Sequence, residues 1–163
     1  MSGEVAEPIL TAFYSIPKIT LYPVILLLFG LSLSARVAFG AIHGVVPVVL
    51  FTMAAVRGVR PIYFRVAQSM RLRPIEMAWH IVVPASLPGI VSGMRVGFSL
   101  TLLGTLIGEM FASQKGLGRM MIKAMDTDDV RLLVALAFLL VLVATTAGGL
   151  LLTLDRGLHR RLG

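Results

Sequence analysis

The chain has 163 residues, of which 57% are hydrophobic and only 14% charged, and its mean hydropathy is +0.91. A soluble domain of this length leaves roughly 30% of its unfolded surface exposed to water, so this composition excludes a soluble globular protein and predicts a lipid-covered one. The net charge of +7 would suit a nucleic-acid binder, but the basic residues lie between apolar runs, so we expect no nucleic-acid partner. The absence of cysteine excludes disulfide frameworks and cysteine-ligated metals.

Four apolar runs are long enough, or nearly so, to cross a bilayer, which requires about 20 helical residues. They lie near residues 9–29, 36–56, 86–111 and 131–153. The first contains Pro17, Lys18 and Pro23, so we expect it to be kinked or broken. Because the sequence has no internal repeat and no long polar linker, residues 1–163 are predicted to form one all-α polytopic membrane bundle with about four transmembrane helices.

The charges between the runs predict how the chain crosses the membrane, since cytoplasmic loops carry an excess of lysine and arginine. The loop 57–80 sets five arginines against one acid, Glu76. Beyond residue 153 three arginines face one acid, whereas residues 112–130 carry equal numbers of basic and acidic side chains. We therefore expect a multi-pass protein whose loop 57–80 and both termini are cytoplasmic and whose residues 112–130 face outward.

The loop 57–80 is longer than a simple connection between adjacent helices requires. Its arginines are interspersed with apolar residues, a pattern that predicts short amphipathic helices able to dock on a soluble partner. We expect this role in addition to that of a positively charged cytoplasmic anchor.

The third run contains Gly89, Gly93 and Gly97, which are four residues apart, so one helix face lacks side chains and lets another backbone approach. Two interpretations stay open: packing inside the bundle, or a face that lines a pathway or a dimer interface. Arg95 and Glu109 share roughly one face of the same run. A charge deep in a span usually faces a partner or a water-filled cavity. Arg95 is therefore either a pathway residue or a hydrogen-bond donor to neighbouring carbonyls, and for Glu109 we favour a structural role.

Sequence motifs of enzymes are missing. There is no G-x-x-x-x-G-K-[ST] phosphate loop, no H-E-x-x-H zinc motif and no G-x-S-x-G nucleophile elbow. His43, His80 and His159 lie at different predicted depths, so they indicate no metal site. We expect no catalytic residue, no cofactor and no ATP hydrolysis by this chain itself.

Residues 57–118 resemble the permeases of binding-protein-dependent ABC importers, especially the nitrate/sulfonate/taurine branch. In that family a cytoplasmic loop carries the motif E-A-A-x-x-x-G, then nine further residues, and then I-x-L-P. With the final proline at Pro84, Val83 takes the leucine position, Ile81 the isoleucine position and Ala67 the second alanine position. Further similarity to this branch lies in residues 17–30, 84–95 and 108–118.

The chain departs from the motif where Arg65, Val66 and Arg71 replace its glutamate, first alanine and glycine. Glycine lets the loop turn in a left-handed conformation, which costs other residues about 1–2 kcal/mol. The reversed charge at Arg65 implies either a partner surface with different charges or weakened coupling. The resemblance implies an ATPase-coupling loop that consists of these three residues and of Ala67, Met70, Leu72, Arg73, Ile81, Val83 and Pro84.

By resemblance, the chain is expected to be a permease subunit of an ATP-driven importer in the bacterial inner membrane. It would pair with a second copy or a homologous permease and enclose the pathway of a small anionic or zwitterionic solute, such as nitrate, a sulfonate or taurine. Its other partners would be a separate ATP-binding cassette ATPase and a periplasmic or lipid-anchored substrate-binding protein.

Family members usually have more spans, and this chain looks like their C-terminal two-thirds, without the first one or two family helices. A natural short form, a misplaced start site and a remnant are all open explanations. The alternative function is therefore that of a truncated, non-transporting membrane scaffold. An intramembrane enzyme is disfavoured, because the sequence lacks the catalytic motifs that such an enzyme would need.

Overall fold

The computed structural model describes the backbone of residues 2–162, with side chains for residues 8–12 and 14–150. Within residues 2–162 the chain forms helices and no strands, which confirms the all-α prediction. The α-helices are α1 Ser2–Ser15, α2 Tyr22–Phe29, α3 Leu33–Arg57, α4 Pro61–Ser69, α5 Pro74–Met77, α6 Val83–Ala112, α7 Leu117–Asp126 and α8 Val130–Leu162. A 3-10 turn, Lys18–Leu21, precedes α2, and a π-helical segment, Ala78–Val82, joins α5 to α6.

Three helical stretches of the described chain are long and apolar enough to cross a bilayer. They are Leu33–Arg57, the continuous stretch Pro74–Ala112, and Val130–Leu150. These stretches correspond to the second, third and fourth predicted runs. The first run is broken, as its prolines predicted: α1 ends at Ser15 and α2 begins only at Tyr22. Pro17 lacks an N–H and disfavours a helical conformation in the residue before it, so α1 cannot continue through this position.

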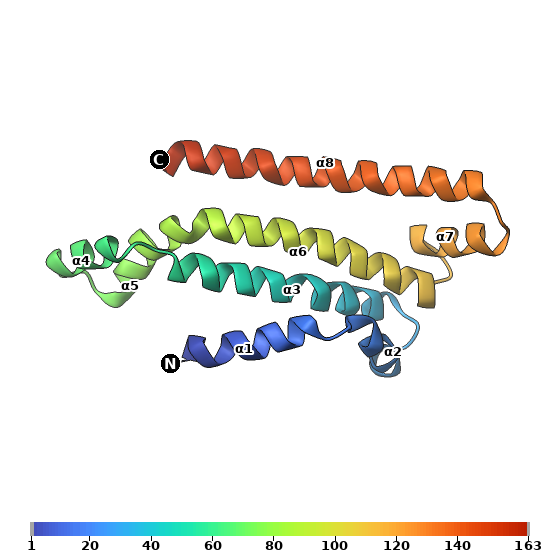
Figure 1. Ribbon diagram of the computed structural model, residues 1–163, viewed down its shortest axis with the longest axis horizontal. Helices are drawn as coiled ribbons and strands as arrows, with labels where there is room; N and C mark the ends of the chain where they lie inside the picture. Colours follow the sequence, from blue (N-terminus) through green and yellow to red (C-terminus); the bar gives the residue numbers. More distant parts are fainter. Residues whose placement is uncertain (1, 163) are drawn as a thin grey trace.

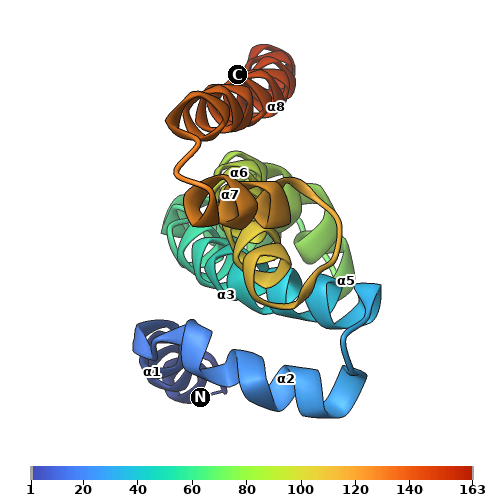
Figure 2. The same cartoon turned by 90° about the vertical axis from the view of Figure 1, so that its right-hand side faces the viewer.

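The antiparallel helices α3 and α6 form the centre of the bundle (Figure 1). In the end-on view of Figure 2, α1 and α2 lie on the α3 side and α8 lies beyond α6. The best-buried cluster joins Tyr22 and Ile25 of α2 to Ala35 and Phe39 of α3. The Tyr22 hydroxyl donates a hydrogen bond of 2.7 Å to the carbonyl oxygen of Gly108, which ties α2 to α6 as well.

The two ends of the bundle carry different elements (Figure 1). The N-terminal end of α1, the C-terminal end of α8 and the short helices α4 and α5 all lie at one end. The other end carries α2 and α7. The predicted topology requires the loop 57–80 and both termini on one side of the membrane, and this arrangement is compatible with it.

Candidate functional site

The glycine face of α6 lies against α3. A Cβ atom at Gly93 would stand 2.6 Å from Cβ of Phe51, and a Cβ atom at Gly97 would stand 2.7 Å from the carbonyl oxygen of Gly44. Gly89 also meets α3 at a distance that leaves no room for a Cβ atom. The two backbones therefore approach as closely as glycine permits. These glycines hold together two helices of the same chain.

Arg95 lies near the middle of α6, on an exposed side of the helix. Together with Ser92 and Ser99 it lines a cavity of about 500 Å³, to which Tyr14 of α1 and Phe51 of α3 also contribute. Among the side chains that the structure describes, none forms a hydrogen bond or an ion pair with its guanidinium group. A charge at this depth of a membrane span needs water or another protein surface.

Glu109 does not share the cavity of Arg95. Its Oε2 atom accepts a hydrogen bond of 3.0 Å from the N–H of Gly118, in the first turn of α7. The backbone at Gly116, where φ is +116°, packs directly against the carboxyl group. A carboxylate at a helix N-terminus is stabilised by the helix dipole. Glu109 thus joins the end of α6 to the start of α7.

The exposed side of α4 carries an apolar ridge formed by Ile62, Val66 and Met70, which are four residues apart and 47%, 46% and 65% exposed. Arg65 is exposed as well and borders this ridge. Ala67, only 1% exposed, anchors the helix on the bundle side. We call residues 61–77 the α4–α5 segment. Its two short helices agree with those predicted for the loop 57–80.

Arg71 ends α4 in a left-handed conformation, with φ of 50°. The N–H of Leu72 donates to the carbonyl oxygen of Ala67 over 3.1 Å, and the N–H of Arg71 donates to that of Gln68 over 3.0 Å. This pair of bonds defines a Schellman motif, in which the left-handed position favours glycine. The chain therefore keeps the turn at the position that the resemblance assigned to glycine, although an arginine occupies it.

Replacing Arg71 with glycine is expected to stabilise the end of α4 by about 1 kcal/mol, because glycine adopts positive φ without a steric penalty. The amide of Leu72 should then exchange its hydrogen about fivefold more slowly. The measurement is hydrogen exchange of the membrane-reconstituted chain. The matched control is Ser69→Gly, at a right-handed helical position two residues earlier, where glycine should destabilise the helix. Faster exchange in Arg71→Gly would contradict the assignment of the turn.

The α4–α5 segment connects directly to the longest helical stretch of the molecule. Pro74 starts α5, and the Glu76 carboxylate accepts the N–H of Arg73 over 2.8 Å, which caps the helix. The N–H of Val83 then bonds to the carbonyl oxygen of Ala78, the π-helical register, just before Pro84. Ile81, Val83 and Pro84 all lie on the continuous helical path that leads from α5 into α6. A displacement of α5 would therefore act on the transmembrane helix α6.

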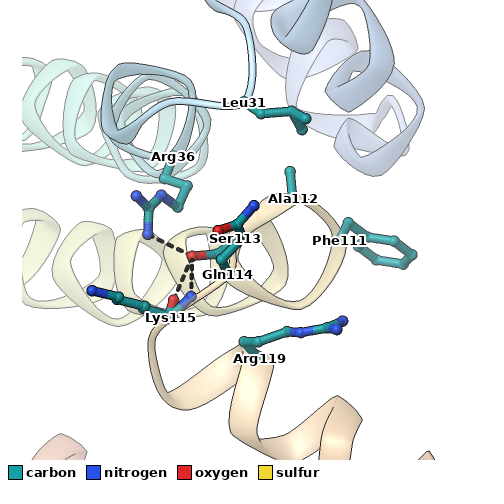
Figure 3. A pocket seen from close by; sticks show the side chains of 8 residues that line it. All are labelled: Leu31, Arg36, Phe111, Ala112, Ser113, Gln114, Lys115 and Arg119. Atoms are coloured by element: carbon teal, nitrogen blue, oxygen red, sulfur yellow. Dashed lines mark hydrogen bonds between the residues drawn. The ribbon is translucent and has the colours of Figure 1, made fainter.

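A basic cavity of about 550 Å³ lies at the opposite end of the bundle (Figure 3). It is lined by Leu31, Arg36, Phe111, Ala112, Ser113, Gln114, Lys115 and Arg119. The Nη1 atom of Arg36 donates a hydrogen bond of 2.8 Å to Oγ of Ser113, which joins the start of α3 to the loop after α6. Sequence reasoning did not identify this site, because its residues are far apart in the chain and the charges of residues 112–130 balance overall.

The histidines take part in local hydrogen bonds. His43 Nδ1 lies 2.9 Å from the carbonyl oxygen of Phe39, and His80 Nδ1 lies 2.9 Å from that of Glu76. Both contacts link a ring to the preceding turn of helix. The side chain of His159 lies outside the described residues.

An all-α bundle with three helical stretches that are long and apolar enough to cross a bilayer is typical of a helical membrane permease. The chain belongs to the family of binding-protein-dependent transport system inner membrane components, whose family model matches residues 2–162. Members of this family are permease subunits of ABC transporters, and they are not enzymes by themselves.

Curated relatives agree with the family. The chain is 28% identical to a probable ABC transporter permease protein of Haemophilus influenzae, over 97% of this chain and 63% of the relative. It is 26% identical to the taurine transport system permease protein of Escherichia coli, over 85% and 53%, and 29% identical to the riboflavin transport system permease protein of Chloroflexus aurantiacus, over 87% and 53%. The chain thus spans between about half and two thirds of the length of these relatives.

Proposed function

We propose that the chain is the permease subunit of an ATP-driven importer and that the α4–α5 segment transmits the work of a separate ATPase to the pathway. The observation that carries this proposal is the exposed apolar ridge of α4 bordered by Arg65, on a segment continuous with α6. An amphipathic helix with an exposed apolar face is suited to docking in a groove of a soluble protein. ATP-driven closure of that partner would push on α4 and tilt α6.

The pathway is proposed to form between this chain and a second copy or a homologous permease. The cavity that Arg95 lines with Ser92 and Ser99 supports this proposal, because a polar surface in the middle of a membrane span is unfavourable against lipid. A second permease facing this side of α6 would replace lipid by protein and water. In this proposal Arg95 is a pathway residue and not a hydrogen-bond donor to neighbouring carbonyls.

The proposed solute is a small anion or zwitterion. Two kinds of relative are named for such cargo, the taurine permease and the aliphatic sulfonate permeases. A cationic Arg95 in the pathway favours a solute that carries a negative group. A periplasmic or lipid-anchored binding protein would deliver this solute at the α2 and α7 end. The whole chain, residues 1–163, acts in this proposal as a single transmembrane domain of the inner membrane with both termini cytoplasmic.

The proposal is tested by placing single cysteines at the two ends of the bundle, since the chain has none of its own. The variants are Ser69→Cys on α4 and Gln114→Cys in the loop after α6, both at exposed positions. A bifunctional maleimide should cross-link position 69, but not 114, to a co-expressed ATP-binding subunit from the same genome. In intact cells, a membrane-impermeant maleimide should label position 114 but not 69.

Each outcome of this experiment has a defined meaning. Labelling of position 69 from outside would overturn the proposed orientation. A chain oriented as proposed that never cross-links to an ATP-binding subunit at position 69 would contradict the coupling role and favour the non-transporting scaffold.

A further inference from the structure

We propose that the basic cavity beside α7 is a binding site for an oxyanion, such as a sulfonate, sulfate or phosphate group. This inference deepens the proposed function. The role of the cavity as the outer entrance of the transport pathway rests on that proposed function. The binding site itself rests on three cations, those of Arg36, Lys115 and Arg119, and on the polar groups of Ser113 and Gln114 between them.

The charge of the cavity is unbalanced. None of the residues that line it is acidic, and among the described side chains no carboxylate pairs with any of its three cations. The Glu109 carboxylate is committed elsewhere, since it accepts the N–H of Gly118 and does not line this cavity. Like charges that share a cavity repel one another, and an anion bound between them would turn this repulsion into attraction.

Two hydrogen bonds hold the guanidinium group of Arg36 in place and leave some of its N–H donors unused. Its Nη1 atom donates to Oγ of Ser113 over 2.8 Å, and its Nε atom donates to the carbonyl oxygen of Ser32 over 3.4 Å. Ser113 in turn accepts the N–H of Lys115 and donates to the carbonyl oxygen of the same residue. Within the described part of the chain, the Nη2 atom of Arg36 forms no hydrogen bond. A positioned guanidinium with free N–H groups suits the planar, two-point recognition of an oxyanion.

Arg119 lies near the start of α7, where the Glu109 carboxylate already accepts the N–H of Gly118. It is the third residue of α7, in the first turn, where the helix dipole favours negative charge and disfavours a cation. Figure 3 shows Arg119 extending towards the side of Phe111, whereas Arg36 and Lys115 lie on the other side of Ser113. In the proposed site, the exposed side chains of Lys115 and Arg119 would rotate about their flexible stems to contact an anion beside Arg36.

The apolar rim restricts the ligand class further. Leu31 and Phe111 line the same cavity and are 79% and 64% exposed. An oxyanion with a short apolar part fits such a rim better than a bare inorganic ion does. Two sources supply this chemistry at the outer face of a membrane: a free organic sulfonate or phosphate, and the headgroup of an anionic phospholipid.

The test uses the full chain in nanodiscs of phosphatidylcholine alone or with phosphatidylglycerol. Binding of radiolabelled sulfate and methanesulfonate reports on free anions, and native mass spectrometry counts retained phosphatidylglycerol. Arg36→Gln is expected to weaken binding of the true ligand class about tenfold or more, since a charge-assisted hydrogen bond is lost. The double variant Lys115→Gln with Arg119→Gln, at two exposed positions, should also weaken it without affecting the fold.

The matched control is Lys123→Gln, an exposed lysine of α7 that does not line the cavity, and it should leave binding unchanged. Saturable anion binding that only the cavity variants weaken supports a free-solute site. Retention of phosphatidylglycerol that only the same variants lose supports a headgroup site. If neither probe distinguishes the cavity variants from Lys123→Gln, the oxyanion site is refuted, even if the variants impair docking of a binding protein. That result would leave the coupling role of α4 unaffected, because no ATPase takes part in this assay.

Discussion

Replacing Gly97 with leucine is expected to destabilise the protein by about 3 kcal/mol or more, because side chains forced into a packed interface commonly cost 1–3 kcal/mol and here the backbones must separate. A Cβ atom at this position would stand 2.7 Å from the Gly44 carbonyl oxygen, and this oxygen belongs to the backbone of α3 and cannot rotate away. The thermal unfolding midpoint of the purified chain should fall by several degrees, and assembly should be lost in the membrane.

The matched control for this prediction is Gly148→Leu. Nothing lies within 4 Å of a Cβ atom at Gly148 of α8, so the same substitution should be tolerated there. Gly108→Ala makes a milder comparison within α6, since its Cβ atom would have ordinary contacts of 3.5 Å. Equal unfolding midpoints for Gly97→Leu and Gly148→Leu would contradict the packing role of the α6 glycines.

Much of the fold follows from local sequence patterns. Length and hydropathy predicted the helices α3, α6 and α8, and Pro17 predicted the break before α2. The spacing of the α6 glycines predicted that another helix packs closely against this face. It did not predict which helix, because a face without side chains can accept any helix. Gly40 and Gly44 of α3 repeat the same spacing, and this signal could have paired the two helices.

The candidate sites were less predictable. The left-handed turn at Arg71 was expected only from the family resemblance, because arginine itself favours a right-handed conformation there. Arg36 and Ser113 are 77 residues apart, and only the packing of α3 on α6 brings them together. A balanced count of charges over residues 112–130 concealed that Lys115 and Arg119 lie near the start of α7, whereas Lys123 lies in its last turn and all three acids lie at or beyond its end.

Reversing the charge of Arg65 is expected to impair coupling, although Arg65→Glu restores the residue of the family motif. Arg65 is exposed beside the apolar ridge of α4, so in the proposed complex it enters a partly desolvated interface and needs an acidic or carbonyl partner. Loss of one member of such a pair commonly costs about 2–5 kcal/mol. The expected consequence is a loss of solute-stimulated ATP hydrolysis of at least about tenfold. Arg131→Glu, at an exposed position at the other end of the bundle, is the control and should have no effect.

The most direct test of the coupling role is a charge-swap cycle on this position. Solute-stimulated ATP hydrolysis is measured in the reconstituted complex of this chain, its ATP-binding subunit and its binding protein. We predict that Arg65→Glu alone abolishes most of the stimulation and that reversing one acid in the receiving groove of the ATP-binding subunit restores it. Full stimulation with Arg65→Glu alone would contradict the account, because α4 would then not dock through this arginine.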